Sequence, residues 1–266
     1  MRSSVNYRTY QYVYIISFFN DNVNLQFLQI LNFINIDELI SSVLHSFKLL
    51  FAVSYGMISV GKNKDKLGGT AMNEYTIVRR TDWANVPVLT MEHHLHPTVA
   101  DVTAQAQLCY DEDALYVRLE AKEANIRKEH TDPLAEICED SCLEFFLCPM
   151  EGDDRYFNLE FNANGNVYLG FGASLPTLHR LIPEKQFIFP KVTFTDSGWA
   201  IEYAIPHDFV RIFFPGYAPA PGKTVRANCY KCGDLTEKPH WLCWNFVPEE
   251  RHTFHCPEYF GLMHFA

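Results

Sequence analysis

Residues 139–172, EDSCLEFFLCPMEGDDRYFNLEFNANGNVYLGFG, contain the pattern that decides the fold. Apolar and polar side chains alternate with a period of two in three short segments, which the turn sequences Gly152-Asp153-Asp154 and Asn164-Gly165 separate. This alternation is typical of half-buried β-strands, and Asp, Asn and Gly are the residues that hairpin turns need. The stretch therefore predicts three consecutive antiparallel strands.

The middle strand, near 155–163, predicts two chemically different faces. Its apolar face carries Phe157, Leu159 and Phe161. Its opposite face carries Tyr156, Asn158, Glu160 and Asn162. A face with Tyr, Asn and Glu, in place of Lys and Thr, suits hydrogen bonding to a polar, uncharged ligand such as a sugar.

Further strand signals recur at close intervals after residue 72. We expect strands near 74–79, 103–110, 114–121, 141–148, 155–163, 166–172, 187–195, 198–205, 224–231 and 240–246. Residues 206–214 predict one short helix with Pro206 in its first turn, and we expect loops at 122–138, 173–186 and 215–223. Strands this dense, with little helical periodicity, predict an all-β fold, an antiparallel β-sandwich.

Composition divides the 266-residue chain near residue 72. All 8 Cys, 14 Pro and 4 Trp lie after residue 71. The chain carries 22 basic and 32 acidic side chains; six and four of these precede residue 72, so 16 and 28 remain and residues 72–266 have a net charge of −12. Because nucleic acids and anionic membranes both require a basic face, this charge argues against both as partners of residues 72–266.

Residues 1–71 predict an N-terminal extension outside the main fold, with two apolar stretches of helical character. Side chains such as Asn20, Asp21 and Lys48 interrupt these stretches, so neither predicts a membrane helix. The sequence LGGTAM at 67–72 resembles a translated ribosome-binding site. We therefore hypothesise that the natural chain starts at Met72, the alternative being a genuine helical extension or a weak membrane anchor.

A start at Met72 would leave no targeting signal, so we expect the domain in the bacterial cytoplasm. Thiols in that compartment stay reduced, and the eight cysteines should then be free. Residues 72–266 should also fold without the extension, because they contain every strand signal and enough apolar side chains for one core.

Two groups of residues suggest chemistry beyond binding. Cys229 and Cys232 have the C-x-x-C spacing of zinc ligands. Residues three apart on a strand face opposite sides, however, and no second C-x-x-C follows, so we expect core thiols. Glu144 and Glu160 would lie on adjacent strands, where paired carboxylates serve either a glycosidase or hydrogen bonds to sugar hydroxyls. We expect the second role, and hence no catalytic residues.

Aromatic residues gather in the last 26 positions: Trp241, Trp244, Phe254, Tyr259 and Phe260. An aromatic ring offers an apolar platform to the C–H face of a sugar ring, while nearby Asn and Glu bind its hydroxyls. The alternative is core packing. The period of two places Trp241 and Trp244 on opposite faces, so one core cannot bury both.

Five motifs, in the expected order, resemble family 9 carbohydrate-binding modules. More closely they resemble the stand-alone bacterial proteins called family 9-like, within the wider DOMON-like group of jelly-roll sandwiches. The resemblance covers about residues 72–266. Its motifs are LCYDEDALYV at 108–117, DSCLEFF at 140–146, YFNLEFNANG at 156–165, RANCYKCGD at 226–234 and FHCPEYFG at 254–261.

The resemblance implies a non-catalytic, carbohydrate-binding β-sandwich that serves carbohydrate breakdown. Glu144 matches the sugar-binding Glu of the family, and Phe254 falls where one of two sandwiching Trp residues stands. Asn158 occupies the place of a basic ligand-binding residue, and nothing in 135–138 matches the other sandwiching Trp. The expected ligand set is Glu144, Asn158, Asn228, Tyr230, Trp244 and Phe254.

We expect no cofactor and no metal ligands. Some members of the family bind calcium, but no residue of this sequence is assigned to such a site. Two rival functions remain open: a glycan-active hydrolase that uses Glu144 and Glu160, and a haem-binding DOMON-like domain. The haem domain would need an axial Met and His, for which Met150 is a candidate without a recognisable partner.

Overall fold

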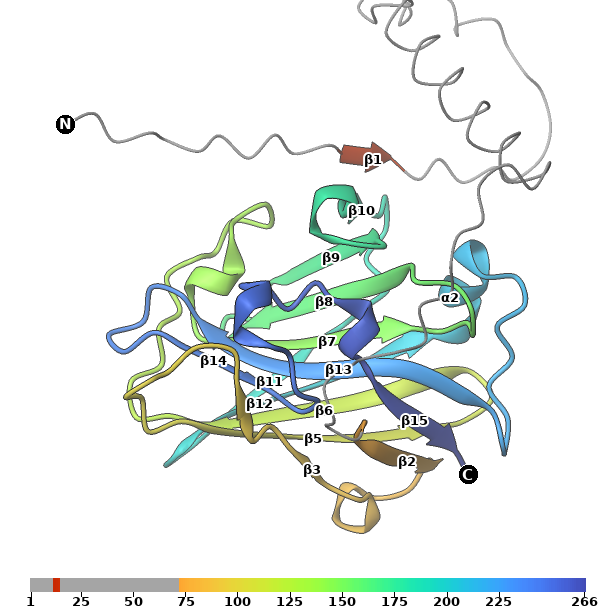
Figure 1. The fold of residues 1–266 in the computed structure, drawn as a ribbon, viewed down its shortest axis with the longest axis horizontal. Coiled ribbons are helices and arrows are strands. Elements are labelled where there is room, and N and C mark those ends of the chain that lie inside the picture. The colour runs from red at the N-terminus through yellow and green to blue at the C-terminus, as the bar shows by residue number, and fades with distance from the viewer. Residues whose placement is uncertain (1–11, 15–71) are drawn as a thin grey trace, which may run out of the picture. The chain divides into compact units, whose positions relative to one another are not determined.

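The structure is a computed structural model that describes residues 12–14 and 72–266 (Figure 1). The helical character expected of the N-terminal extension lies outside the described residues. Within that extension, Tyr12–Tyr14 form the short strand β1, which pairs in parallel with β10 (His179–Ile182). In the described part of the chain, no helix combines the length and the apolar character needed to cross a bilayer.

The mostly-β class is confirmed. The remaining strands are β2 (Glu74–Arg79), β3 (Leu89–Thr90), β4 (His93–His94), β5 (Thr103–Tyr110), β6 (Ala114–Lys122), β7 (Cys142–Cys148), β8 (Tyr156–Asn162), β9 (Val167–Gly172), β11 (Lys191–Thr195), β12 (Gly198–Pro206), β13 (Thr224–Gly233), β14 (His240–Cys243) and β15 (Gly261–Phe265). The short helix α2 spans His207–Phe213. It begins one residue later than predicted, with Pro206 at the N-cap position.

The prediction that all strands pair antiparallel was wrong for part of the sheet. One layer has the order β10-β9-β8-β7-β13-β15, and the other has the order β5-β6-β12-β11. Strand β2 joins the layers, because Glu74–Ile77 pair with β15 and Val78–Arg79 pair with β5, both in parallel. A strand that passes from one layer to the other makes the sheet continuous and mixed.

The positions of several elements also differ from expectation. The predicted loop 173–186 contains strand β10. The strand expected from residue 187 begins only at Lys191, and the one expected to reach residue 246 ends at Cys243. Strands β3, β4 and β15 were not predicted.

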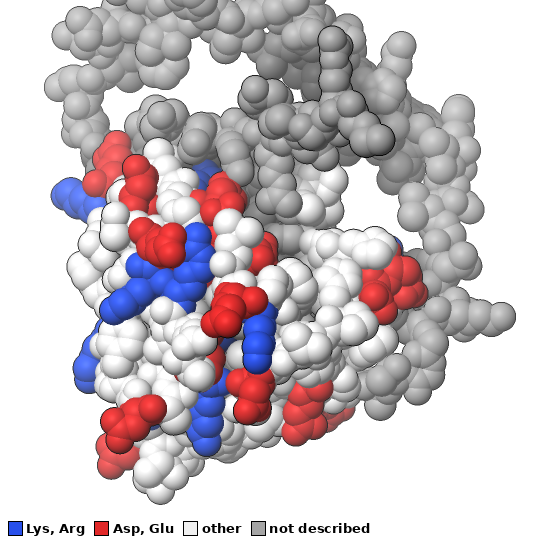
Figure 2. Space-filling view, turned by 90° about the vertical axis from the view of Figure 1, so that its left-hand side faces the viewer, with Lys and Arg blue, Asp and Glu red and all other residues white. Residues whose placement is uncertain are grey.

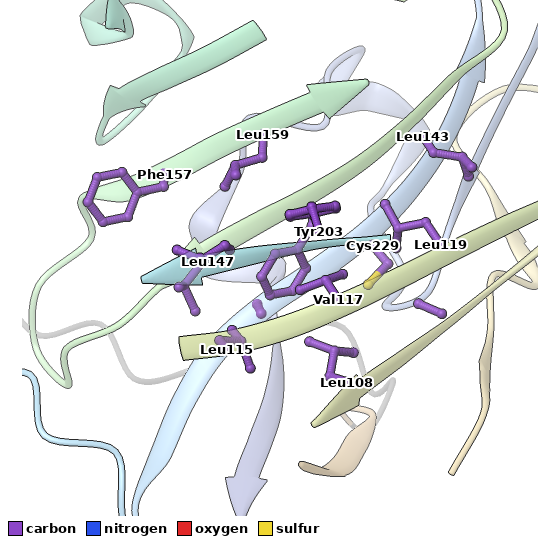
Figure 3. Close-up of a cluster of buried hydrophobic side chains, with 14 of the residues drawn as sticks. Leu108, Leu115, Val117, Leu119, Leu143, Leu147, Phe157, Leu159, Tyr203 and Cys229 are labelled. Atoms are coloured by element: carbon purple, nitrogen blue, oxygen red, sulfur yellow. The ribbon is translucent and has the colours of Figure 1, made fainter. Parts of the chain in front are cut away.

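The main core lies between the two layers (Figure 3). The predicted inward face of β8 is confirmed, since Phe157 and Leu159 are fully buried in this core. They lie opposite Val117 and Leu119 of β6, which are fully buried too. Full burial of one such side chain contributes roughly 1.5–3 kcal/mol, so this apolar layer is the main source of stability.

The opposite face of β7 and β8 is covered as well. Every residue of both strands is buried, including the polar face that we expected to bind a ligand. A second apolar cluster covers it, built around Phe146, Tyr156, Tyr230, Phe254 and Phe260. Phe254 and Phe260 come from the C-terminal loop, which therefore closes over the sheet and leaves a pocket at one end.

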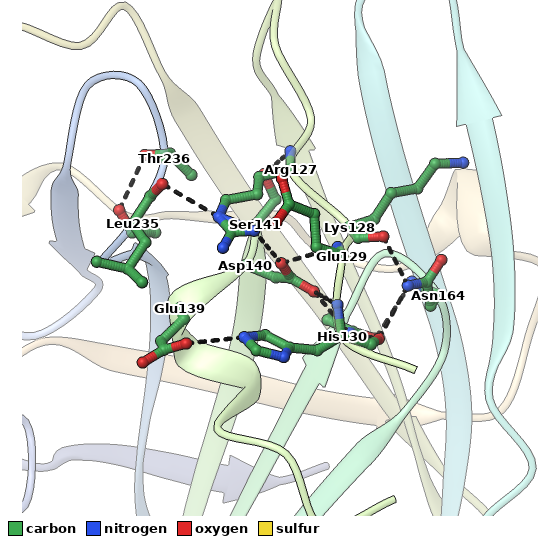
Figure 4. Close-up of polar contacts among 12 residues, drawn as sticks. Arg127, Lys128, Glu129, His130, Glu139, Asp140, Ser141, Asn164, Leu235 and Thr236 are labelled. Atoms are coloured by element: carbon green, nitrogen blue, oxygen red, sulfur yellow. Dashed lines mark hydrogen bonds and ion pairs between the residues drawn. The ribbon is translucent and has the colours of Figure 1, made fainter. Parts of the chain in front are cut away.

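The loop at residues 123–141 is held in place by Asp140 (Figure 4). This fully buried carboxylate accepts hydrogen bonds from Arg127 Nη1 and from the backbone N–H groups of Glu129 and His130, at 2.9–3.1 Å. Asn162 Nδ2 donates a fourth, at 3.0 Å. Carboxylates with several donors are strong anchors, so Asp140 fixes the loop that forms one wall of the pocket.

A buried ion pair ties the end of β13 to the loop that follows β6. Lys231 Nζ lies 3.2 Å from the Glu123 carboxylate, and both side chains are buried. Glu123 also accepts hydrogen bonds from Trp199 Nε1 at 2.6 Å and Ser141 Oγ at 2.9 Å. Lys231 Nζ donates to His240 Nε2 at 2.8 Å. Both charged groups of the pair thus have further hydrogen-bonding partners.

Candidate functional site

A pocket of about 610 Å³ lies over the polar face of β7, β8 and β13. This volume is in the range of roughly 300–1,000 Å³ that small-molecule sites have. Residues from six strands and from the segments between them line it: Leu95, His96, Glu136, Cys138, Glu144, Glu160, Tyr168, Leu175, Pro176, Leu178, Arg180, Cys232, Asp234, Trp241, His252, Thr253, Phe254 and His255.

Two carboxyl groups lie side by side in the floor of the pocket. Glu144 of β7 and Glu160 of β8 are direct cross-strand partners, 3% and 8% exposed. Burial raises the pKa of Glu144 well above its usual value, and the charge of Glu160 raises it further. Burial raises the pKa of Glu160 to about 7, against a hydrogen bond from Asn158 that lowers it. Near neutral pH this pair therefore offers both a proton donor and an acceptor.

The raised pKa of Glu160 predicts a pH-dependent effect on stability. In the unfolded chain Glu160 ionises near pH 4.5, whereas in the folded protein it keeps its proton up to about pH 7. Between these values the folded state binds more protons, so the contribution of Glu160 to stability is lost as the pH rises. A tenfold change in proton affinity corresponds to about 1.4 kcal/mol, so the loss by pH 8 is on the order of 3 kcal/mol.

Urea unfolding of the wild type and of Glu160→Gln at pH 5 and pH 8 measures this effect. The free energy of unfolding of the variant, relative to the wild type, should increase between the two pH values. The comparison must be made with the variant because burial lowers the pKa of His240 to about 4, which acts on stability in the opposite direction. An equal pH dependence in both proteins would contradict the assignment to Glu160.

Aromatic side chains form the walls of the pocket. Trp241 of β14 lines it, and its Nε1 donates a 2.7 Å hydrogen bond to Asp234 Oδ1, which fixes the orientation of the indole. The edge of His96 packs against this indole, with ring centroids 5.4 Å apart. Phe254 lines the pocket from the C-terminal loop and stacks on Tyr230 at 4.2 Å. The pocket thus combines apolar ring faces with carboxyl groups.

Arg180 supplies a positive charge in the same pocket. It lies on β10, is buried, and its guanidinium stands 4.5 Å from the centre of the Tyr168 ring. Its Nη1 donates to the carbonyl of Leu134 at 2.8 Å. The charge of Arg180 also lowers the pKa of Glu160, against the effect of burial. Sequence reasoning missed Arg180 because the surrounding segment was expected to be a loop.

His252 marks the rim of the pocket with an uncommon backbone conformation. Its φ is +53°, in the left-handed region, and no other non-glycine residue in the described ranges has a positive φ. Its ring stacks on His96 at 5.7 Å. Such conformations cost energy and concentrate at functional sites.

The structure brings only part of the expected ligand set to the pocket. Glu144 and Phe254 line it, as described above. Asn158 lies beside it, fully buried, and its Nδ2 donates to Glu160 at 2.8 Å. Tyr230 lies beneath Phe254, and its hydroxyl donates to the Phe254 carbonyl at 3.1 Å.

Asn228 and Trp244 lie elsewhere. The Oδ1 of Asn228 accepts from the backbone N–H groups of Cys229 and Asn245, and its Nδ2 donates to the Asn245 carbonyl. This amide therefore connects β13 to the backbone just after β14. Trp244 is 5% exposed and belongs to the main core between the layers. The indole at the pocket is that of Trp241, on the other face of the same segment.

The prediction that Cys229 and Cys232 face opposite sides is confirmed, because Cys229 lies in the main core and Cys232 in the second cluster. In the described residues, one group of His, Cys, Asp or Glu donors is close enough to share an ion: Cys142, Glu144 and Cys232. Calcium takes six to eight oxygen ligands, so this sulfur-rich group does not fit the calcium known from the resembling family.

The molecular surface adds little to the choice of ligand. Figure 2 shows acidic and basic side chains interspersed over one face, without a large area of one sign. A mixed surface of this kind gives no electrostatic reason to expect a polyanion. The pocket remains the feature that best defines a ligand.

Residues 74–265 match the profile of a family described as carbohydrate-binding family 9. No curated protein has a significant match to the chain. The profile match covers about three quarters of the chain, including every strand from β2 to β15.

Several solved structures share the fold. A candidate carbohydrate-binding protein from Bacteroides uniformis ATCC 8492 is 24% identical, with a TM-score of 0.63, over 74% of this chain and 100% of that chain. A family 9 module from Caldicellulosiruptor kristjanssonii in complex with cellotriose is 13% identical, with a TM-score of 0.53, over 73% of this chain and 94% of that chain. A family 9 module from the same organism in complex with glucose is 12% identical, with a TM-score of 0.53, over 73% and 96%.

Proposed function

We propose, since this chain belongs to carbohydrate-binding family 9, that it binds the end or a short segment of a carbohydrate in the pocket, without catalysis. The neighbours from Caldicellulosiruptor kristjanssonii bind cellotriose and glucose, so these two sugars are the first ligands to test. The wider relation to DOMON-like jelly rolls, and a role beside glycan breakdown in a bacterial cytoplasm, belong to the same proposal.

One observation carries this proposal: aromatic rings and carboxyl groups line the same pocket. Trp241 and Phe254 offer apolar faces, and Glu144 and Glu160 offer hydrogen-bonding oxygens. A pyranose has C–H faces that pack on rings and equatorial hydroxyls that need donors and acceptors. Arg180 adds N–H donors, because its guanidinium group stays protonated throughout the physiological pH range.

Binding is favoured over hydrolysis by the family match, because the family is described as carbohydrate-binding. A glycosidase needs one protonated and one ionised carboxyl group, which it obtains from environments that move the two pKa values apart. Burial raises the pKa of both Glu144 and Glu160. Burial thus disfavours the ionised form of both groups, and a nucleophile or general base has to be ionised.

The Glu144→Gln variant tests this function. Glutamine keeps the shape of the side chain but replaces one acceptor oxygen by an NH₂ group, so a sugar hydroxyl loses an acceptor. Because burial favours the neutral form of Glu144, its hydrogen bond contributes roughly 0.5–1.5 kcal/mol, and affinity for cellotriose or glucose should fall about two- to tenfold. Calorimetric titration measures this, and thermal melting should show little change in Tm.

The matched control is Glu120→Gln, the same substitution on the opposite layer, where Glu120 pairs with Arg118 at 3.0 Å. This variant should bind sugar as the wild type does. Unchanged affinity in folded Glu144→Gln would remove Glu144 from the site. If the wild type bound no member of a broad glycan panel, the proposed function itself would be wrong.

A further inference from the structure

Three possible metal ligands converge in the floor of the pocket. Cys142 of β7 and Cys232 of β13 are direct cross-strand partners. Glu144 lies two residues further along β7, on the same face of the strand. The two sulfur atoms and a carboxylate oxygen all lie within 4.8 Å of one another, and all three residues are buried. One ion among them would contact all three.

One of the two thiols already contacts the Glu144 carboxyl group. The Cys232 thiol donates a hydrogen bond to this carboxyl, with Sγ 2.8 Å from Oε1. A thiol is a weak donor, whereas a buried carboxyl group is costly unless strong partners compensate for lost water. A cation at this position would provide that compensation.

We propose that Cys142, Cys232 and Glu144 bind a borderline-soft divalent ion of the Zn²⁺ class, with a fourth position open to the pocket. Two thiolates select such an ion over Ca²⁺ or Mg²⁺. Zn–S and Zn–O bonds of about 2.3 Å and 2.0–2.2 Å require donor atoms that lie close together, as these three do. Glu144 and Cys232 line the pocket, which gives the ion a path from solvent.

Binding exchanges protons for the ion. Cys142 and Cys232 would bind the ion as thiolates, and Glu144 would bind it as a carboxylate. A bound ion deprotonates its ligands. One divalent ion therefore enters as up to three protons leave, and the affinity should increase with pH.

Titration of the reduced, metal-free full chain with Co²⁺ tests the proposal. One equivalent of Co²⁺ should produce a thiolate-to-cobalt charge-transfer band in the near ultraviolet and the visible d–d bands of a tetrahedral site, and Zn²⁺ should bleach both. Cys142→Ser, Cys232→Ser and Glu144→Gln should each lower the affinity at least tenfold. No carbohydrate is present, so the result is independent of the proposed function.

Cys148→Ser is the matched control. Cys148 lies on the same strand and the same face as Cys142, but its Sγ bonds to the Asp153 carbonyl at 2.9 Å. This variant should retain both bands and the affinity of the wild type. Absence of a charge-transfer band in the wild type would overturn the proposal. So would a band that persists unchanged in Cys142→Ser and Cys232→Ser, because other thiols would then hold the ion.

Discussion

Replacement of Lys231 by Met is expected to lower the free energy of unfolding by about 3–5 kcal/mol. The ammonium of Lys231 is fully buried and lies 3.2 Å from the Glu123 carboxylate. Without it, hydrogen bonds from Trp199 and Ser141 alone must stabilise a buried negative charge. In a domain of 150–250 residues, 1 kcal/mol changes Tm by about 2–4 °C, so Tm should fall by about 6–20 °C.

The matched control is Arg79→Met, which removes the cation of an exposed ion pair. Arg79 Nη1 lies 2.9 Å from Glu112 Oε1, and the two side chains are 54% and 80% exposed. Exposed pairs contribute about 0–1 kcal/mol, so this variant should melt close to the wild type. Thermal melting and urea unfolding measure both variants. Equal, small losses in the two would show that burial of the Lys231 pair has no energetic consequence.

The central hairpins could be predicted from the sequence because their signals are local. In β7, β8 and β9 the period of two and the Asn-Gly turn lie within 34 consecutive residues. The sequence also separated Phe157 and Leu159 from Asn158 and Glu160 correctly. Local alternation decides which residues share a face, and the structure places these sets on opposite faces.

The missed elements depend on partners far away in the chain. Strand β15 has five residues and pairs with β2, which lies almost 190 positions earlier. Strand β10 has four residues and follows a Pro-containing turn at Leu175–Thr177. Such short segments carry too few alternating positions to be distinguished from loops. The parallel pairing of β2 likewise leaves no local signal.

The sequence predicted the carboxyl groups of the candidate site correctly. It did not predict that Trp241, and not Trp244, lines the pocket. Alternation showed that Trp241 and Trp244 face opposite sides, but not which side is the main core, because apolar clusters cover both faces of this layer. The amide of Asn228 looked like a ligand, yet it satisfies backbone groups of a turn. The approach of Cys142 to Cys232 follows from the β7–β13 register, which only the tertiary structure fixes.

Replacement of Trp241 by Ala is expected to weaken sugar binding about 30-fold or more. A buried aromatic contact at the centre of an interface contributes 2 kcal/mol or more, and every 1.4 kcal/mol is a tenfold change in Kd. The hydrogen bond to Asp234 holds the indole in a fixed orientation, so little conformational entropy is lost when a sugar packs on it. Calorimetric titration with cellotriose and glucose measures the change, and Trp241→Phe should restore most of the affinity because it restores a ring.

Trp244→Phe separates this proposal from the expectation based on sequence. Trp244 packs in the main core, with its ring edge against Tyr75 at a centroid distance of 6.5 Å. Loss of part of this large side chain leaves a cavity, so Tm should fall while the affinity of the folded protein stays the same. The opposite pair of results, with affinity lost in Trp244→Phe and retained in Trp241→Ala, would move the binding surface to the other face of β14. The pocket between β14 and the C-terminal loop would then have no role in sugar recognition.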